Sequence, residues 1–311
     1  MAFKAPDNYL DFYNEMVRKS EKLIEIGYWD KIEIRRLHKW LGNFETDEEK
    51  YLSSLILYKL VYRNDKSIDS MLNKLFHITI PSLLEEYNIY PFNMTMNEWR
   101  RKLRDKGFKN VGNFLFSTII SDELGDSGND YIRRLREKFV VKELIRKVTD
   151  NKIRHHKALI FIDDILASGT QINIFLTKYK QDLEKYEYLI FTPLIAHKNG
   201  IKKIEEKFES LGYRNTLIIK PLEIITCDNH ILDFKIKDNG CFDSTNSIQD
   251  LENFYISLVN RKELKQKNEG DFGFGNLGLN LIFSTGIPDN TIPLIRCKND
   301  DNSWFPLYEK F

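Results

Sequence analysis

Two neighbouring carboxylates follow an apolar run in the middle of the chain. Asp163 and Asp164 come directly after residues 158–162, Ala-Leu-Ile-Phe-Ile, and such a run is typical of a buried strand. The residues that follow are small or carry hydroxyl or amide groups, and they include Ala167, Ser168, Gly169, Thr170 and Gln171. This order predicts a strand, a short loop and the start of a helix.

Each part of this segment suits one part of a phosphorylated sugar. The amino end of a helix offers unpaired N–H groups and the positive end of the helix dipole, which both favour a phosphate monoester. Gly169 lets the backbone approach a ligand closely, and the hydroxyls of Ser168 and Thr170 add donors. Asp163 and Asp164 can accept hydrogen bonds from two adjacent hydroxyls and can help to hold a hydrated magnesium ion through water. The segment therefore predicts a site for a ribose 5-phosphate.

The segment resembles the phosphoribosyl pyrophosphate-binding motif of type I phosphoribosyltransferases. In that motif an apolar strand and two acidic residues precede a small-residue loop, which usually ends in Thr-Gly-x-Thr. Asp163, Asp164 and Gly169 match it position by position, and Ser168 stands where the first Thr is usual. The resemblance implies that the two carboxylates are the catalytic pair and hold the ribose hydroxyls. It also implies that the backbone of 167–171 binds the 5-phosphate and that Mg is the cofactor.

Two positions depart from that motif. Ala167 stands where some purine-type members carry an aspartate that assists the base, and Gln171 replaces the usual closing Thr. Thr170 falls at the variable position. Together these departures argue against purine salvage. A simpler alternative stays open, in which a strand ends in a solvated acidic pair before an ordinary capped helix.

A second candidate is the polar loop after the preceding apolar run, residues 114–120. In the resembled fold, the loop after the first sheet strand binds pyrophosphate through exposed backbone amides. We expect this pyrophosphate loop at Gly125, Asp126, Ser127 and Gly128. Asp126 would repel a pyrophosphate unless a metal intervenes or the following arginines offset its charge; these are Arg133, Arg134 and Arg136. A surface turn capped by Ser127 or Asp126 is the alternative.

Two further polar residues follow the apolar run 188–195. His197 and Lys198 are candidates for contact with the substrate, through its base or a phosphate, because they come just after a predicted strand. Solvated polar residues at a strand end are the alternative. Near the amino terminus, His38 and Trp40 are expected to be packing residues.

Alternating strands and helices must position these residues. The pattern predicts strands at 158–163, 188–195 and 216–220, with helices at 170–185 and 200–211 between them. This alternation implies a parallel sheet with helices on both faces and ligands beyond the carboxyl ends of its strands. In the tail we expect a helix at 249–262 and strands at 279–283 and 291–297.

Residues 1–110 show a different pattern. Apolar residues recur there at helical spacing, Thr46 and Glu49 form a capping box, and Pro81 marks a helix break or restart. We therefore predict an α/β protein: an N-terminal all-helical cap or interaction region over 1–110, then a phosphoribosyltransferase-like α/β domain with an irregular C-terminal extension over 111–311. In that domain, helices flank the parallel sheet.

The composition limits the classes of partner. The 311 residues include 47 Lys plus Arg and 46 Asp plus Glu, so the net charge is +1. This balance removes the simplest electrostatic argument for nucleic acid as a partner. Hydrophobic residues make up 42% and charged residues 30%, which is far from the composition of disordered chains.

The sequence also indicates a compartment. Its start lacks the apolar segment of a signal peptide, and its apolar runs are much shorter than the roughly 18 residues that span a bilayer. Cys227, Cys241 and Cys297 are widely spaced and form neither a disulfide framework nor a zinc motif. We expect a cytoplasmic protein with no membrane partner and no disulfide partner.

The layout of the whole chain is similar to that of a phosphoribosyltransferase-like family of bacterial conflict systems, known from retrons and other anti-phage islands. Three motifs carry this resemblance: Trp-Leu-Gly-Asn-Phe at 40–44, Pro-Asp-Asn-Thr at 288–291, and Trp-Phe-Pro-Leu-Tyr at 304–308. The family pattern usually reads Pro-Asn-Asn-Thr and ends in Leu-Phe-Pro-Arg, so Asp289 and residues 307–310 are diverged here.

The resemblance implies an effector of an anti-phage defence system. It would bind phosphoribosyl pyrophosphate or a nucleotide with magnesium and transfer or cleave at the anomeric carbon of the ribose. Its protein partner would be a reverse transcriptase complex or a DNA-binding accessory protein. Two alternatives stay open: a non-catalytic module that senses a nucleotide or binds a partner, and a nucleobase salvage phosphoribosyltransferase.

Overall fold

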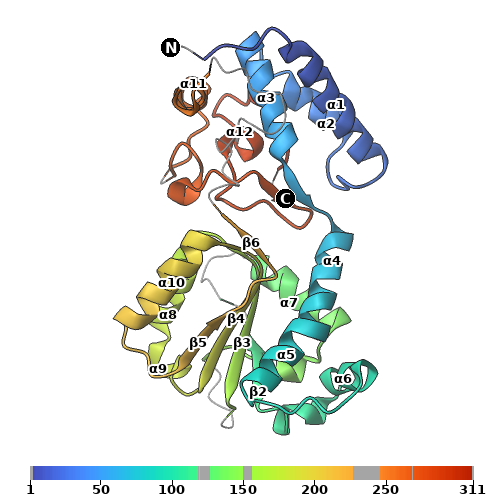
Figure 1. Ribbon diagram of the computed structural model, residues 1–311, viewed down its shortest axis with the longest axis vertical. Coiled ribbons are helices and arrows are strands. Elements are labelled where there is room, and N and C mark those ends of the chain that lie inside the picture. Colours follow the sequence, from blue (N-terminus) through green and yellow to red (C-terminus); the bar gives the residue numbers. More distant parts are fainter. Residues whose placement is uncertain are drawn as a thin grey trace. The chain divides into compact units, whose positions relative to one another are not determined.

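The computed structural model describes residues 3–117, 119, 127–149, 156–226, 246–267 and 269–309. Its chain forms two compact units (Figure 1). Met1–Ser67 and Thr226–Phe311 together make one, here named the terminal unit, and Ile68–Ile225 make the other, the sheet unit. This division differs from the expected boundary at 110/111, because the segment 68–110 packs with the sheet and the C-terminal tail packs with the first helices.

The sheet unit contains a five-stranded parallel sheet in the described residues. Its strands are β2 (Phe114–Ser117), β3 (Ala158–Leu166), β4 (Tyr188–His197), β5 (Thr216–Ile219) and β6 (Glu223–Ile225). They run in the order β2-β3-β4-β5, and β6 also pairs with β4. Every pair is parallel, so the predicted parallel sheet flanked by helices is confirmed.

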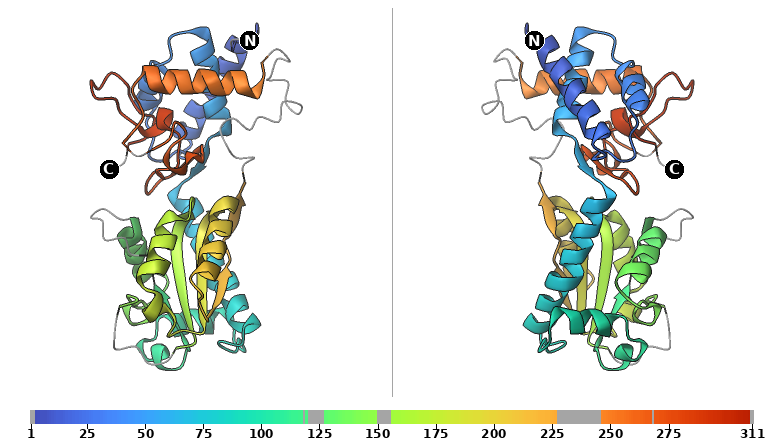
Figure 2. Two further views of the ribbon diagram at one scale, coloured as in Figure 1. Left: turned by 90° about the vertical axis from the view of Figure 1, so that its left-hand side faces the viewer. Right: turned by 90° about the vertical axis from the view of Figure 1, so that its right-hand side faces the viewer.

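Helices cover both faces of this sheet. The face of Leu159 and Phe161 packs against helices that follow β3 and β4: α8 (Thr170–Lys178), α9 (Lys180–Leu183) and α10 (Lys198–Ser210). On the other face, Phe116 contacts Phe76, which stacks on Phe139 at 4.8 Å between ring centroids. The elements on that side are α4 (Asp65–Lys74), the π-helical turn Leu75–Thr79, α5 (Ile80–Glu86), α6 (Met96–Leu103), the 3₁₀ turns Lys106–Asn110 and Lys142–Leu144, and α7 (Ser127–Lys138). Figure 2 shows α8 and α10 in front of the sheet in its left view and α5 in its right view.

The direction of the strand order reverses beside β2. Ile145 forms a parallel bridge with Phe116, and the Arg146 N–H donates to the Phe116 carbonyl at 2.9 Å, so this segment lies on the outer edge of β2. After β2 the chain therefore first passes to the outer edge of the sheet, beside β2. It then returns to form β3, which pairs with the opposite side of β2. A reversal of this kind leaves a crevice between the carboxyl ends of the two strands, where ligands of open α/β sheets bind.

A proline lies inside β4, a central strand. Pro193 pairs with Asp163 of β3, and its carbonyl accepts from the Leu222 N–H at 3.3 Å. Its nitrogen therefore faces the junction between β5, whose pairing with β4 ends at Ile219, and β6, whose pairing begins at Glu223. The sheet needs no donor at this junction, which is why it tolerates a proline there.

The terminal unit combines both ends of the sequence. The N-terminal segment supplies α1 (Tyr9–Glu25), α2 (Ile34–Leu41), α3 (Asp47–Lys59) and β1 (Val61–Arg63). The C-terminal segment supplies α11 (Ile248–Arg261), the 3₁₀ turn Phe274–Asn276, β7 (Leu281–Phe283) and α12 (Pro293–Arg296). The parallel pair β1–β7 joins the two segments, and one hydrophobic core includes side chains from both.

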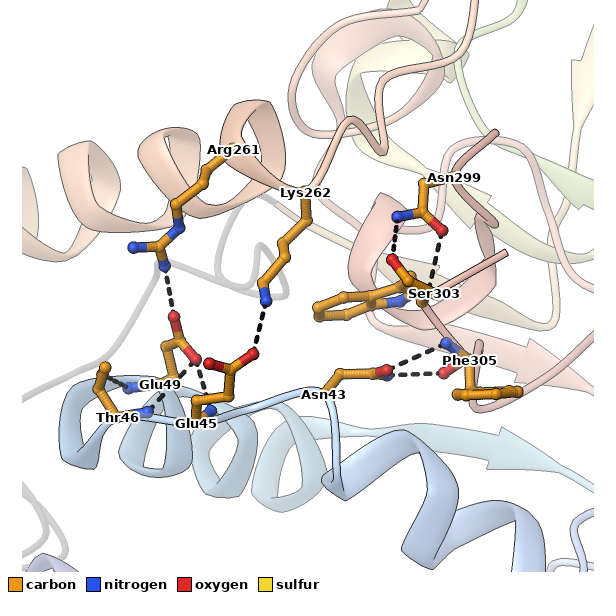
Figure 3. A network of polar contacts seen from close by, with 10 residues as sticks. Asn43, Glu45, Thr46, Glu49, Arg261, Lys262, Asn299, Ser303 and Phe305 are labelled. Atoms are coloured by element: carbon orange, nitrogen blue, oxygen red, sulfur yellow. Dashed lines mark hydrogen bonds and ion pairs between the residues drawn. The ribbon is translucent and has the colours of Figure 1, made fainter. Parts of the chain in front are cut away.

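The sequence motifs near the two ends meet in this unit. The Trp40 indole N–H donates to the Leu294 carbonyl at 2.7 Å, and Phe44 packs edge-on against Trp304. The Asn43 amide donates to the Phe305 carbonyl at 2.8 Å and accepts from the Phe305 N–H at 3.1 Å (Figure 3). Buried Trp40 is therefore a packing residue, as predicted, whereas the same prediction is wrong for His38, which is exposed and lies 2.7 Å from Glu21 Oε1 through its Nε2.

Several local predictions are confirmed and others are wrong. Thr46 and Glu49 form the expected capping box, and Pro81 lies in the first turn of α5. The predicted strand at 291–297 is wrong: Pro293 begins the short helix α12, and proline suits a first helical turn because it lacks the N–H that this turn leaves unpaired. The N-terminal region also includes the strand β1, whose partner β7 lies more than 200 residues away.

No helix in the described residues is long and apolar enough to cross a membrane. Cys297 is a buried free thiol, whereas Cys227 and Cys241 lie outside the described residues.

Candidate functional site

The predicted carboxylate pair lies at the carboxyl end of β3, beside the reversal of the strand order. Asp163 and Asp164 are half-buried. The Asp164 N–H donates to Asp163 Oδ1 at 2.9 Å, and the Ile165 N–H donates to Asp164 Oδ1 at 2.8 Å. Each carboxylate thus accepts a hydrogen bond from the backbone N–H of the next residue, and both residues belong to strand β3.

The loop after β3 leads directly into α8. Ala167, Ser168 and Gly169 are buried, and Gly169 has φ of +76°, a left-handed conformation that favours glycine. Gly169 is the N-cap residue of α8 and, as a glycine, has no side chain with which to cap this end. The Thr170 N–H lies 3.4 Å from Ser168 Oγ, which itself donates to Thr170 Oγ1 at 3.1 Å. Apart from the Thr170 N–H, backbone donors of the first turn, which includes Gln171, are therefore available to an anion such as phosphate.

The amino end of α10 packs directly against this loop. A Cβ atom on Gly200 would lie 2.1 Å from the Ala167 carbonyl oxygen and 2.7 Å from Leu166 Cδ2. A Cβ on Gly169 would lie 3.0 Å from the Gly200 carbonyl oxygen. Only a glycine at position 200 allows the helix and the loop to approach this closely, so Gly200 sets the position of the loop.

His197 and Lys198 lie at the end of β4, next to the loop. Leu166 pairs with Ala196, so His197 follows at the same sheet edge as Ala167. His197 is buried, and its Nδ1 accepts the Asn199 N–H at 3.1 Å as the N-cap of α10. Burial and, less strongly, the charge of Lys203 lower the pKa of His197, so it is neutral at pH 7 and carries its proton on Nε2. Lys198 is exposed.

The predicted pyrophosphate loop is only partly described. Gly125 and Asp126 lie outside the described residues, while Ser127 and Gly128 form the first turn of α7, so these two are helical and not part of a loop. Of the arginines expected to offset Asp126, Arg134 forms an ion pair with Asp69 at 3.5 Å. The pyrophosphate role of this segment stays a prediction.

The donor set fits magnesium. The described residues contain no group of three or more His, Cys, Asp or Glu side chains that could hold a metal by themselves. Asp163 and Asp164 nevertheless offer two adjacent carboxylates, and Mg²⁺ is usually bound by one or two carboxylates together with water and substrate phosphates. These residues would hold the metal together with a phosphorylated ligand.

Two residues that support the site are not among the candidates that the sequence analysis names. Gly200 has no distinctive neighbours in the sequence, and its role comes from contact with a loop more than 30 residues away. Thr192 is fully buried in β4, and its hydroxyl donates to the Phe161 carbonyl at 2.9 Å, which ties β4 to β3 just before the carboxylates. A polar residue within an otherwise apolar run was the available signal for Thr192.

Comparison with known proteins adds one positive finding. A search of curated proteins gives no match. A family model described as PRTase-CE matches residues 37–310, which is most of the chain and includes parts of both units. The parallel sheet flanked by helices agrees with the fold of phosphoribosyltransferases. The chain therefore belongs to the PRTase-CE family, a phosphoribosyltransferase-like family.

Proposed function

We propose that the sheet unit binds phosphoribosyl pyrophosphate, or a nucleotide of the same phosphoribosyl type, at the carboxyl end of β3. The observation that carries this proposal is that groups suited to two parts of the ligand, its ribose and its 5-phosphate, lie at the same edge of the sheet. Asp163 and Asp164 can accept the two ribose hydroxyls, and the uncapped amino end of α8, behind Gly169, can bind the 5-phosphate. Magnesium, when bound, would offset the charge of the phosphates.

The same arrangement suits transfer at the anomeric carbon. The bond between that carbon and the pyrophosphate oxygen breaks, pyrophosphate leaves with the electron pair, and an acceptor forms the new bond. The Asp163–Asp164 pair orients the ribose while positive charge develops on its ring, and the loop at 167–171 keeps the 5-phosphate in place. His197 is neutral and can donate a hydrogen bond from Nε2 at this edge.

We further propose that the protein acts in the cytoplasm as an effector of an anti-phage defence system. Its protein partner would be a reverse transcriptase complex or a DNA-binding accessory protein. The support is the resemblance carried by the three motifs at 40–44, 288–291 and 304–308, two of which bind each other in the terminal unit.

A non-catalytic nucleotide sensor is the second candidate. It is favoured by Ala167, which is buried at the place where some purine-type members carry an acid that assists the base. This candidate predicts binding of the phosphoribosyl ligand without turnover.

The test measures binding and turnover separately. We expect Asp163→Asn/Asp164→Asn to weaken calorimetric binding of phosphoribosyl pyrophosphate with Mg²⁺ at least tenfold, because ribose contacts and metal contacts are lost together. The matched control is Glu205→Gln/Glu206→Gln, an adjacent and exposed acidic pair on α10. Release of pyrophosphate in the wild type, lost in the first variant, would favour the transferase, and binding without release would favour the sensor. Full binding by the aspartate variant would refute both.

A further inference from the structure

A second candidate site lies in the terminal unit. A cavity of about 340 Å³ opens beside α2 and the C-terminal segment 298–309. This volume lies near the lower end of the range for small-molecule pockets, about 300–1,000 Å³. It is large enough for one nucleotide-sized ligand, and all of the residues that line it belong to the terminal unit.

The cavity carries an excess of positive charge. Four of its side chains are cationic and two are carboxylates: Arg35, Arg36, Lys39 and Lys298, against Glu33 and Glu309. Glu309 is already shared, because its Oε1 lies 3.2 Å from Arg36 Nη1 and 3.0 Å from Lys298 Nζ. Arg35 forms no ion pair within the described ranges. An anionic ligand would balance this charge.

One residue of the cavity wall holds a buried N–H for which the described residues supply no acceptor. Trp304 lines the cavity and is 2% exposed, yet its indole Nε1 has no hydrogen-bond partner in the part of the chain that the structure describes. An unpaired buried N–H lowers the stability of a fold. In contrast, the indole of Trp40, in the same core, donates to a carbonyl at 2.7 Å. Because this nitrogen has almost no accessible surface, Trp304 contributes its packed ring, and not its N–H, to the cavity wall.

An aromatic ring is held at the cavity although much of it is exposed. The backbone of Phe305 is fixed by both hydrogen bonds to Asn43, while its side chain remains 45% exposed (Figure 3). Lys39 Nζ lies 5.1 Å from the centroid of this ring. A flat, partly exposed ring beside cations is a surface on which a base can stack next to its phosphate.

We propose that this cavity binds a nucleoside monophosphate, at a site separate from the sheet unit. Arg35 and Lys39 contact the phosphate, and the Phe305 ring stacks on the base. The excess of two positive charges matches the charge of a phosphate monoester, and the volume excludes a longer ligand from full enclosure.

The experiment uses the full chain carrying Asp163→Asn/Asp164→Asn, so that binding in the sheet unit is suppressed. Calorimetry is done with AMP, GMP, CMP and UMP, with adenosine and inorganic phosphate as the two halves of a ligand. We expect at least one monophosphate to bind at least tenfold more tightly than either half. Arg35→Ala/Lys39→Ala should weaken this binding at least tenfold, and Phe305→Ala should reduce the preference over inorganic phosphate.

The control removes the same charge elsewhere. Arg18→Ala/Lys19→Ala changes two exposed cations of α1 and should leave the affinity within twofold. Arg35→Gln removes one charge but keeps a long polar side chain, so it should also weaken binding and tests the cavity even if the double variant unfolds. The proposal is overturned if no monophosphate binds, if Arg35→Ala/Lys39→Ala binds like its parent, or if the control weakens binding equally. Because the parent already lacks the carboxylates, failure of the proposed phosphoribosyl site would leave this result unaffected.

Discussion

Substitution of Gly200 by alanine tests whether α10 positions the phosphate loop. In an unconstrained helix this change would stabilise the protein by about 1 kcal/mol. Here the new Cβ would lie 2.1 Å from the Ala167 carbonyl oxygen, so the loop or the helix must move by roughly 1 Å to reach the 3.0 Å minimum of real contacts. Overpacking of this kind costs about 1–3 kcal/mol, which leaves a net loss of about 0–2 kcal/mol in the free energy of unfolding.

The effect on the ligand should be larger than the effect on stability. A misplacement of about 1 Å at a binding centre can cost on the order of 100-fold. We therefore expect Gly200→Ala to weaken calorimetric binding of phosphoribosyl pyrophosphate with Mg²⁺ by roughly 10- to 100-fold, while urea denaturation shows a folded protein. The control is Gly286→Ala, where a new Cβ would meet nothing within 4 Å. Affinity within twofold of the wild type in a folded Gly200→Ala protein would refute the role of α10 as a support.

Two further variants each test one side chain, His197 in the sheet unit and Arg296 in the terminal unit. Because the folded-state pKa of His197 lies below its unfolded value, protonation favours unfolding, and stability should fall as the pH drops from about 6.5 toward that lowered pKa. His197→Asn keeps an N-cap acceptor and should flatten this slope in urea denaturation series, whereas an unchanged slope would contradict the assignment. Arg296→Ala should cost about 3–5 kcal/mol, because it leaves the carboxylate of Glu269 buried and unpaired at 9% exposure. Lys202→Ala, which breaks an exposed pair, should cost less than about 1 kcal/mol in the same chemical denaturation, and equal losses would refute this difference.

The strand and loop of the candidate site could be predicted because their determinants are contiguous. An apolar run, two carboxylates and Gly169 lie within a dozen residues, and the structure has β3, the turn and α8 in that order. The roles of Asp163 and Asp164 in binding stay predictions. The support by Gly200 could not be found in the same way, since it depends on how closely a separate helix approaches the loop.

The division into units could not be predicted from local patterns. Helical spacing in 1–110 indicates helices but not which core they enter, and the first helices pack with a tail more than 200 residues away. The helix α12 within residues 291–297 could not be predicted for a related reason. Its apolar residues suggested a strand, but it lies on a core formed by other segments, where Thr291 donates to the Leu281 carbonyl at 2.8 Å and Pro293 begins a helix.

The joining of both chain ends in the terminal unit has a consequence for biosynthesis. Trp40 and its acceptor Leu294 are 254 positions apart. At roughly 5–20 residues per second, a ribosome needs about 13–50 s to make the connecting chain. During that time the sheet unit, which is continuous in sequence, can fold, whereas the first helices must wait with their apolar faces uncovered. We therefore expect nascent chains that stop before β7 to expose these helices to chaperones and proteases until the segment from β7 onward is made and completes the terminal unit.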